Sequence, residues 1–247
     1  MSDGGSILSA EICLRDRWPA RENIPLSGWS IRTTLGSAHR PNSVWTGGDV
    51  SERNIDWAIE SVEAFYAGRS MPVRFQMLVE TRPRDLDDRL ARRGYRREHP
   101  SLGLARAVSP RPMPENVTVA PEMTGDWKGL YTAAQDAERL PEHFDILSLI
   151  QPPAGFIVAH VAGKPAAVAL VGRTGDDVAI DCVLTHPDIR RSGAATAVMH
   201  AAEAWAAAQG ATRLLLMVGE ANSAARTLYG KLGYEQLTSY YFRIKTL

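Results

Sequence analysis

The sequence predicts an α/β protein made of two tandem domains, each with a mixed central sheet flanked by helices. Three observations support this. Strand and helix patterns alternate through the C-terminal half, the N-terminal half follows a fainter version of the same order, and three prolines fall between residues 110 and 114. Prolines so close together prevent a helix and make a stiff connector. We therefore place the domains at residues 1–108 and 116–247, with a linker at 109–115.

Apolar runs bounded by turn residues define the elements of the second domain. Its strands are expected at 117–120, 156–162, 166–172, 178–185, 213–218 and 240–244, and its helices at 126–137, 194–209 and 223–232. In the first domain, strands are expected at 29–33, 43–46 and 73–78, and helices at 55–66 and 86–93. In both domains a helix ends on Gly-Tyr, at Tyr95 and Tyr234, before a final strand.

The turn at residues 190–195 reads Arg-Arg-Ser-Gly-Ala-Ala and lies between the buried strand at 178–185 and the long helix that follows. Small residues let successive backbone N–H groups point at one anion, and a helix N-terminus adds a partial positive charge. The turn is therefore predicted to bind a pyrophosphate.

This turn resembles the acetyl-CoA loop of the GNAT (GCN5-related) N-acetyltransferases, Arg/Gln-x-x-Gly-x-Gly/Ala, which Arg190, Gly193 and Ala195 fit. A second stretch resembles the family's other signature, in which an Asn precedes a helix that carries Leu-Tyr and ends in Gly-Phe/Tyr. Asn222 and Tyr229 fit it. Two signatures in the right order are more specific than one. The chain is thus similar to a tandem GNAT protein whose first domain is degenerate.

The resemblance implies that acetyl-CoA is the acyl donor and that the second domain binds it. The expected cofactor-binding residues are Leu184, Thr185, Arg190, Arg191, Ser192, Gly193, Ala194, Ala195, Thr196 and Asn222. A backbone N–H at Leu184 or Thr185 would stabilise the thioester oxygen as it becomes anionic. Asn222 would either bond to the pantetheine arm or cap the helix that follows it.

The same resemblance assigns Tyr229 as the general acid that protonates the departing thiolate. Asp181 is the candidate base that accepts the proton of the amine, because a carboxylate inside an apolar strand is costly unless it has a task or a partner. Strand alternation puts it on the face opposite Cys182. Glu220, Glu142, His143 and proton loss through water are the alternatives.

The first domain has residues 47–54 where a CoA loop would stand, with the acidic Asp49 and Glu52 and no Arg-x-x-Gly-x-Ala spacing. We expect this domain to bind no CoA and to shape the acceptor pocket. Some of its aromatic and polar residues are candidates either for that pocket or for the core, namely Trp18, Trp29, Arg32, Arg40 and Asn42.

Composition narrows the choice of partners. Lys plus Arg and Asp plus Glu each number 28, so no global field favours nucleic acid or an anionic membrane. The longest apolar run, 166–172, is too short to span a bilayer. The polar N-terminus and the presence of only two cysteines favour a cytoplasmic protein. The histidines lack metal-ligand spacing, so no metal is expected.

The function expected from the sequence is acetyl transfer from acetyl-CoA to a primary amine of a small molecule or amino acid, by direct attack on the thioester, in a monomer or homodimer. A protein or peptide N-acetyltransferase and a non-catalytic CoA-binding sensor are the alternatives.

Overall fold

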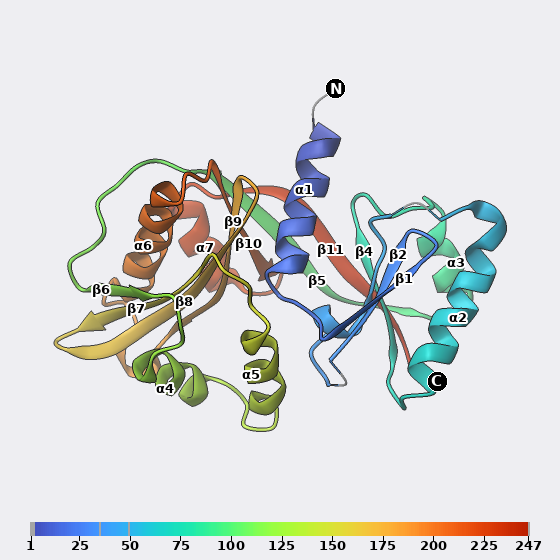
Figure 1. Cartoon of the computed structure of the whole chain (residues 1–247), viewed down its shortest axis with the longest axis horizontal. Coiled ribbons are helices and arrows are strands. Elements are labelled where there is room, and N and C mark those ends of the chain that lie inside the picture. Colours follow the sequence, from blue (N-terminus) through green and yellow to red (C-terminus); the bar gives the residue numbers. More distant parts are fainter. Residues whose placement is uncertain (1–2, 35, 49, 247) are drawn as a thin grey trace.

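The strands of the protein form one continuous mixed sheet (Figure 1) in a computed structural model that describes residues 3–34, 36–48 and 50–246. The strand order is β1-β2-β3-β4-β11-β5-β10-β9-β8-β7-β6. The predicted α/β class with a mixed sheet and flanking helices is confirmed, but the strands of the two halves join into a single sheet. Asp49 lies outside the described residues.

The element bounds follow the predicted order with several differences. The first half contains α1 (Asp3–Asp16), β1 (Glu22–Leu26), β2 (Trp29–Thr33), β3 (Val44–Trp45), α2 (Ile55–Ala67), β4 (Val73–Leu78), α3 (Leu86–Arg92) and β5 (Arg96–Ala107). The second half contains β6 (Val117–Ala120), α4 (Gly125–Ala134), α5 (Leu140–Ser148), β7 (Ala154–Val161), β8 (Lys164–Thr174), β9 (Asp177–Thr185), α6 (Ala194–Ala208), β10 (Arg213–Gly219), α7 (Ser223–Lys231) and β11 (Glu235–Lys245).

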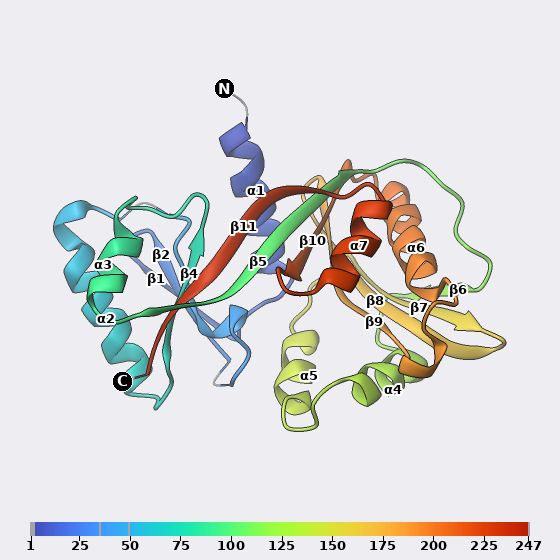
Figure 2. The ribbon, with the colours of Figure 1, turned by 180° about the vertical axis from the view of Figure 1, so that it is seen from behind.

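Two long strands, β5 and β11, join the halves. β11 pairs with β4 from Tyr240 to Lys245 and with β5 along most of its length, while β5 also pairs with β10. Figures 1 and 2 both show these strands running side by side from one half to the other. The last strand is therefore longer than the predicted 240–244, because it bridges the sheet of both halves.

Helices cover both faces of the sheet in the second half. α6 packs against β7, β8 and β9 through an apolar stripe that includes Val198 and Ala201. On the other face, α4 places Trp127 and Tyr131 in a second cluster together with residues of α5. Around the first half, α2 and α3 pack in a separate cluster, centred on Ile59. Each half thus has a core of its own.

Two helices differ from the predictions. The helix expected at 126–137 ends at Ala134, and α5 starts at Leu140 with Pro141 in its first turn, where proline is favoured. Helix α1 was not predicted. It packs Ala10, Cys13 and Leu14 against β9 and β10 at the centre of the molecule.

Within the described residues, no helix has the length and apolar character needed to cross a membrane.

Candidate functional site

The sheet opens between β9 and β10. These parallel strands stay paired as far as Ile180 and Leu216. Beyond that point β9 continues beside β8 to Thr185, whereas β10 continues beside β5 to Gly219. The edge of β9 that faces β10 is therefore free of ladder partners at residues 181–185, and its backbone groups are available to a ligand.

A β-bulge bends β9 at this opening. Leu170 pairs with Asp181, but Val168 pairs with Leu184, so β9 has one residue more than β8 in this interval. Cys182 takes a positive φ of 54° there. An extra residue breaks the two-residue alternation of a strand and re-aims the side chains that follow it.

The bulge overturns one prediction. The Asp181 carboxylate binds Arg40, whose guanidinium lies over the Trp18 ring, while Cys182 lies beside the hydroxyl of Tyr131. Trp18 and Tyr131 belong to the same cluster, on the face of the sheet that α4 covers. The expectation that Asp181 and Cys182 face opposite sides is therefore wrong.

A cavity of about 850 Å³ lies at the opening, and we call it the cofactor cavity. It brings together every residue predicted to bind the cofactor, and Tyr229 as well. Its lining consists of Ala133, Ala134, Val183, Leu184, Thr185, Pro187, Arg190, Arg191, Ser192, Gly193, Ala194, Ala195, Thr196, Asn222, Ala224, Ala225, Leu228 and Tyr229. Asp181 is not part of this lining.

The turn before α6 fits a bound pyrophosphate. Gly193 precedes the helix in the left-handed region, with a φ of 86°, and a Cβ built there would meet no atom within 4 Å. A ligand can therefore come close to the backbone. In the part of the chain that the structure describes, the N–H groups of Gly193, Ala195 and Thr196 have no acceptor. These N–H groups, together with the positive end of the helix dipole, could donate to an anion.

Tyr229 has the environment of a proton donor. Its side chain is buried and lines the cofactor cavity, and its hydroxyl has no hydrogen-bond partner among the described residues. Burial, with a smaller effect of the nearby Asp181 charge, raises the pKa of Tyr229 to about 12. The phenol therefore keeps its proton at neutral pH and can donate it to a group in the cavity.

Asn222 caps α7. Its Oδ1 atom accepts a hydrogen bond from the Ala225 N–H at 3.1 Å. The capping alternative is confirmed, and because Asn222 also lines the cofactor cavity, a contact with the pantetheine arm stays a prediction.

Asp181 forms a partly buried ion pair across the junction of the two halves. An Arg40 Nη atom donates to its carboxylate at 2.7 Å, and the two side chains are 18% and 8% exposed, for Arg40 and Asp181 respectively. The partner that a carboxylate inside a strand needs is thus an arginine of the first half. The role of Asp181 as a base stays a prediction.

A second cavity, of about 570 Å³, lies between the halves, and we call it the junction cavity. It includes two of the alternative bases, Glu220 and His143, and two of the candidate pocket residues, Trp18 and Arg40. The lining consists of Trp18, Ala38, His39, Arg40, His99, Pro100, Ser101, Arg139, His143, Gly219, Glu220, Ala221, Tyr240 and Phe242.

Glu142, the remaining alternative base, anchors a loop of the first half. Its carboxylate accepts hydrogen bonds from the N–H groups of Ser37 and Ala38, the hydroxyls of Thr34 and Ser37, and the Asn42 side-chain amide. Burial alone would raise the pKa of Glu142, but these hydrogen bonds hold it below its usual value. The loop fixed in this way carries His39 and Arg40 into the junction cavity.

The other candidate pocket residues are structural. Trp29 is buried and donates from its indole nitrogen to the Arg82 carbonyl at 2.9 Å. Arg32 is buried and donates to backbone carbonyls of the first half, while Asn42 is held by the Glu142 network. Neither cavity includes these residues in its lining.

Sequence reasoning missed most of the junction cavity. No local motif links five of its lining residues, which come from separate segments: His39, His99, Arg139, Tyr240 and Phe242.

Among the described residues, no group of three His, Cys, Asp or Glu side chains could hold a metal ion.

Comparisons with known proteins show the family to which the chain is similar. The family model described as "Probable histone acetyltransferase Rv0428c C-terminal" matches residues 5–242. The uncharacterized N-acetyltransferase YobR of Bacillus subtilis (strain 168) is 27% identical over 236 residues, which cover 92% of this chain and 94% of that protein.

Solved structures share the fold. A GCN5-related N-acetyltransferase from Kribbella flavida matches with a TM-score of 0.72 at 20% identity, over 98% of this chain and 96% of that one. A tandem GNAT protein from the clavulanic acid biosynthesis pathway matches with a TM-score of 0.60 at 10% identity, over 78% of this chain and 70% of that one.

Proposed function

The chain belongs to the GNAT N-acetyltransferase superfamily, with an Rv0428c-type C-terminal domain, and from this premise we propose that it acetylates a primary amine of a small molecule or amino acid. The observation that carries the proposal is the cofactor cavity. It joins three features in one space: the turn at Gly193 with its free backbone N–H groups, a strand edge free of ladder partners, and the Tyr229 hydroxyl, which has no hydrogen-bond partner among the described residues.

Acetyl-CoA supplies an acyl group that is activated as a thioester. The turn at residues 190–196 would hold its pyrophosphate, with Arg190 and Arg191 adding positive charge. The free edge of β9 would receive the acyl end, where the N–H of Leu184 or Thr185 can donate to the carbonyl oxygen. Asn222 would contact the pantetheine arm beside its cap of α7.

In the proposed reaction the amine nitrogen attacks the carbonyl carbon, and the carbon–sulfur bond breaks. Tyr229 donates a proton to the departing sulfur, and its raised pKa keeps that proton available at neutral pH. Asp181 accepts the proton that the amine loses. His143 is the alternative base, because it lines the junction cavity and is held by the Tyr131 hydroxyl, 3.0 Å from its Nδ1 atom.

The tandem arrangement is part of the proposal. We infer a degenerate GNAT-like domain at residues 1–108 and an acetyl-CoA-binding domain at 116–247, joined by the proline-rich linker at 109–115. The separate cores around α2 and α6 support this division. The first domain would help to bind the acceptor amine, since its anchored loop at residues 36–42 contributes to the lining of the junction cavity.

The experiment that tests the proposal is thiol release from acetyl-CoA in the presence of a panel of amines, with a lysine-containing peptide as one arm. Mass spectrometry identifies the acetylated product. Thiol release that depends on a small amine supports the proposal. Release with the peptide alone would favour the protein substrate that the family description names. Acetyl-CoA binding without release in any arm would indicate a sensor.

A further inference from the structure

The junction cavity shares a wall with the cofactor cavity. Ala221 lines the junction cavity, and the next residue, Asn222, lines the cofactor cavity. On β9, Val183 lines the cofactor cavity, while Asp181 holds Arg40, which lines the junction cavity. Two short segments, 181–183 and 219–222, therefore separate the spaces. A ligand in the junction cavity would lie close to the acyl end of a bound donor.

Flat rings make up much of the lining. The rings of His39 and His99 lie 4.3 Å apart and are tilted by 32°, and Phe242 lies 5.6 Å from His39. Trp18 meets His143 edge to face at 5.9 Å. Such surfaces suit a planar group, because ring faces and ring edges attract one another.

His39 and His143 add little charge to the lining. Burial, with a smaller effect of the nearby Arg74 charge, lowers the pKa of His39 to about 4. Burial also lowers the pKa of His143. Both rings are therefore neutral at neutral pH, when they present apolar faces and single hydrogen-bonding nitrogens.

Two residues of the lining, Arg139 and Glu220, are exposed to solvent and carry opposite charges. Arg40 is neutralised by Asp181. In contrast, neither Arg139 nor Glu220 forms an ion pair or a side-chain hydrogen bond with any residue that the structure describes. Glu220 belongs to the wall segment beside the cofactor cavity. Arg139 precedes α5, which Figure 1 shows beside the junction of the two halves. Among the described residues of this lining, Glu220 is thus an anion and Arg139 a cation that a ligand can reach.

We propose that the junction cavity is the acceptor site and that it takes an amine that carries both a planar ring and a carboxylate, as a free aromatic amino acid does. Glu220 attracts the ammonium group toward the shared wall, Arg139 binds the carboxylate, and the rings of His39 and His99 receive the planar side chain. This inference rests on the proposed acetyl transfer and names its acceptor class.

Four acceptors separate the two recognition features. Phenylalanine has a ring and a carboxylate, phenethylamine only the ring, alanine only the carboxylate, and propylamine neither. Thiol release from acetyl-CoA gives kcat/KM for each of them. We expect phenylalanine to exceed every other acceptor by at least about tenfold, because each of the others lacks the ring, the carboxylate or both.

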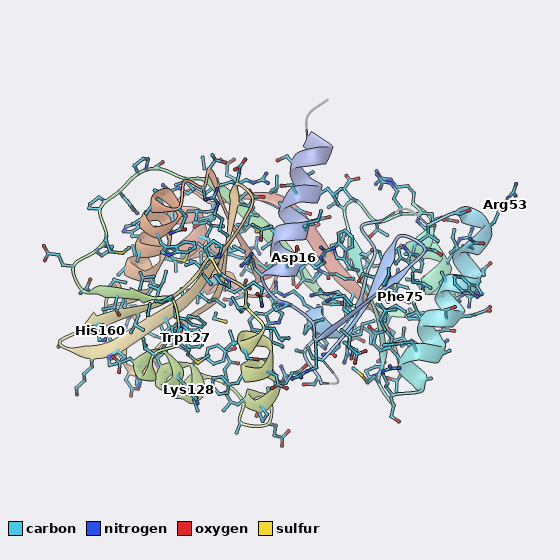
Figure 3. The ribbon with its side chains drawn as sticks, viewed as in Figure 1. Asp16, Arg53, Phe75, Trp127, Lys128 and His160 are labelled. Carbon is cyan, nitrogen blue, oxygen red and sulfur yellow. The ribbon has the colours of Figure 1, made fainter. Side chains whose placement is uncertain are left out.

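Arg139→Gln tests the carboxylate contact. It should raise KM for phenylalanine about tenfold and leave KM for phenethylamine and the affinity for acetyl-CoA unchanged. The matched control is Arg53→Gln, because Arg53 is an exposed arginine that Figure 3 shows pointing away from the junction, at the far edge of the first half. The control should change none of these values.

Calorimetric titration with N-acetylphenylalanine, the expected product, gives a readout that needs no turnover. Binding that Arg139→Gln weakens about tenfold supports the inference. Equal activity with all four acceptors, an unchanged KM for phenylalanine in Arg139→Gln, or no binding of phenylalanine and its acetyl derivative would overturn it and leave acetyl transfer standing. If phenylalanine binds and no amine releases thiol, the proposed function fails instead and the binding site stands.

Discussion

The Arg40 guanidinium donates to the Asp181 carboxylate at 2.7 Å, and this partly buried pair joins a loop of the first half to the bulge of β9. The two residues are 141 positions apart in sequence. Arg40 lines the junction cavity, and Val183, two residues after Asp181, lines the cofactor cavity. The first half therefore helps to set the position of the carboxylate that we propose as the base.

Asp181→Asn should lower kcat by about 100-fold or more, as expected for the loss of a general base, and leave the affinity for acetyl-CoA unchanged. The matched control is Asp177→Asn. Asp177 lies on the same strand and pairs with Arg213 at 2.7 Å, but Arg213, unlike Arg40, does not line the junction cavity. Steady-state kinetics that show the same small loss in both variants would reduce Asp181 to a structural partner of Arg40.

Tyr229→Phe should lower kcat by about 100-fold while the dissociation constant for acetyl-CoA stays the same, because only the proton donor is removed. Tyr234→Phe is the control, since that ring is buried 6.0 Å from Tyr229 and does not line the cofactor cavity. The pKa of Tyr229, about 12, also predicts that kcat does not fall between pH 7 and about 10. If Tyr229→Phe kept full activity, Tyr229 would not be the general acid.

Glu142→Ala should raise KM for the acceptor and leave acetyl-CoA binding intact, because the loop at residues 36–42 loses its anchor while the turn at Gly193 is untouched. The loss of several charge-assisted hydrogen bonds should also cost roughly 1–3 kcal/mol in the free energy of unfolding. Kinetics and urea denaturation measure the two effects. Glu138→Ala, at an exposed site nearby, should show neither.

Glu11→Gln should stabilise the protein above pH 7 and have little effect at pH 4. Burial raises the pKa of Glu11 from 4.5 to about 7, although Thr238 donates a hydrogen bond to it at 2.7 Å. A raised folded-state pKa means that the stability present below about pH 4.5 is lost as the pH rises through about 7. Urea denaturation at pH 5 and pH 8 measures the difference. If the free energy of unfolding changed with pH in the same way in the parent and in Glu11→Gln, ionisation of Glu11 would not be the cause of the change.

The cofactor cavity could be predicted because its determinants are local in sequence. The glycine turn before α6 and the Asn222 cap of α7 each depend on a few consecutive residues, whose spacing reflects turn and helix geometry. The strand at 178–185 was predicted to within one residue of β9 for the same reason.

The junction cavity and the single sheet could not be predicted in this way. They depend on β11 pairing with β4 and on the loop at 36–42 meeting Glu142, contacts that a linear pattern does not encode. The bulge at Cys182 likewise depends on the longer path of β9 beside β8. Pro141, in contrast, was a missed local signal for the start of α5.

The central claim is that the turn at Gly193 binds acetyl-CoA, and calorimetric titration with acetyl-CoA tests it most directly in two matched variants. Gly193 and Gly210 flank α6, both have a positive φ, and a Cβ at either position would meet no atom within 4 Å. The backbone strain of Gly193→Trp and Gly210→Trp is therefore similar, but only Gly193 lines the cofactor cavity. We predict saturable one-to-one binding in the parent and in Gly210→Trp, and its loss in Gly193→Trp. Equal binding in all three proteins would contradict the claim.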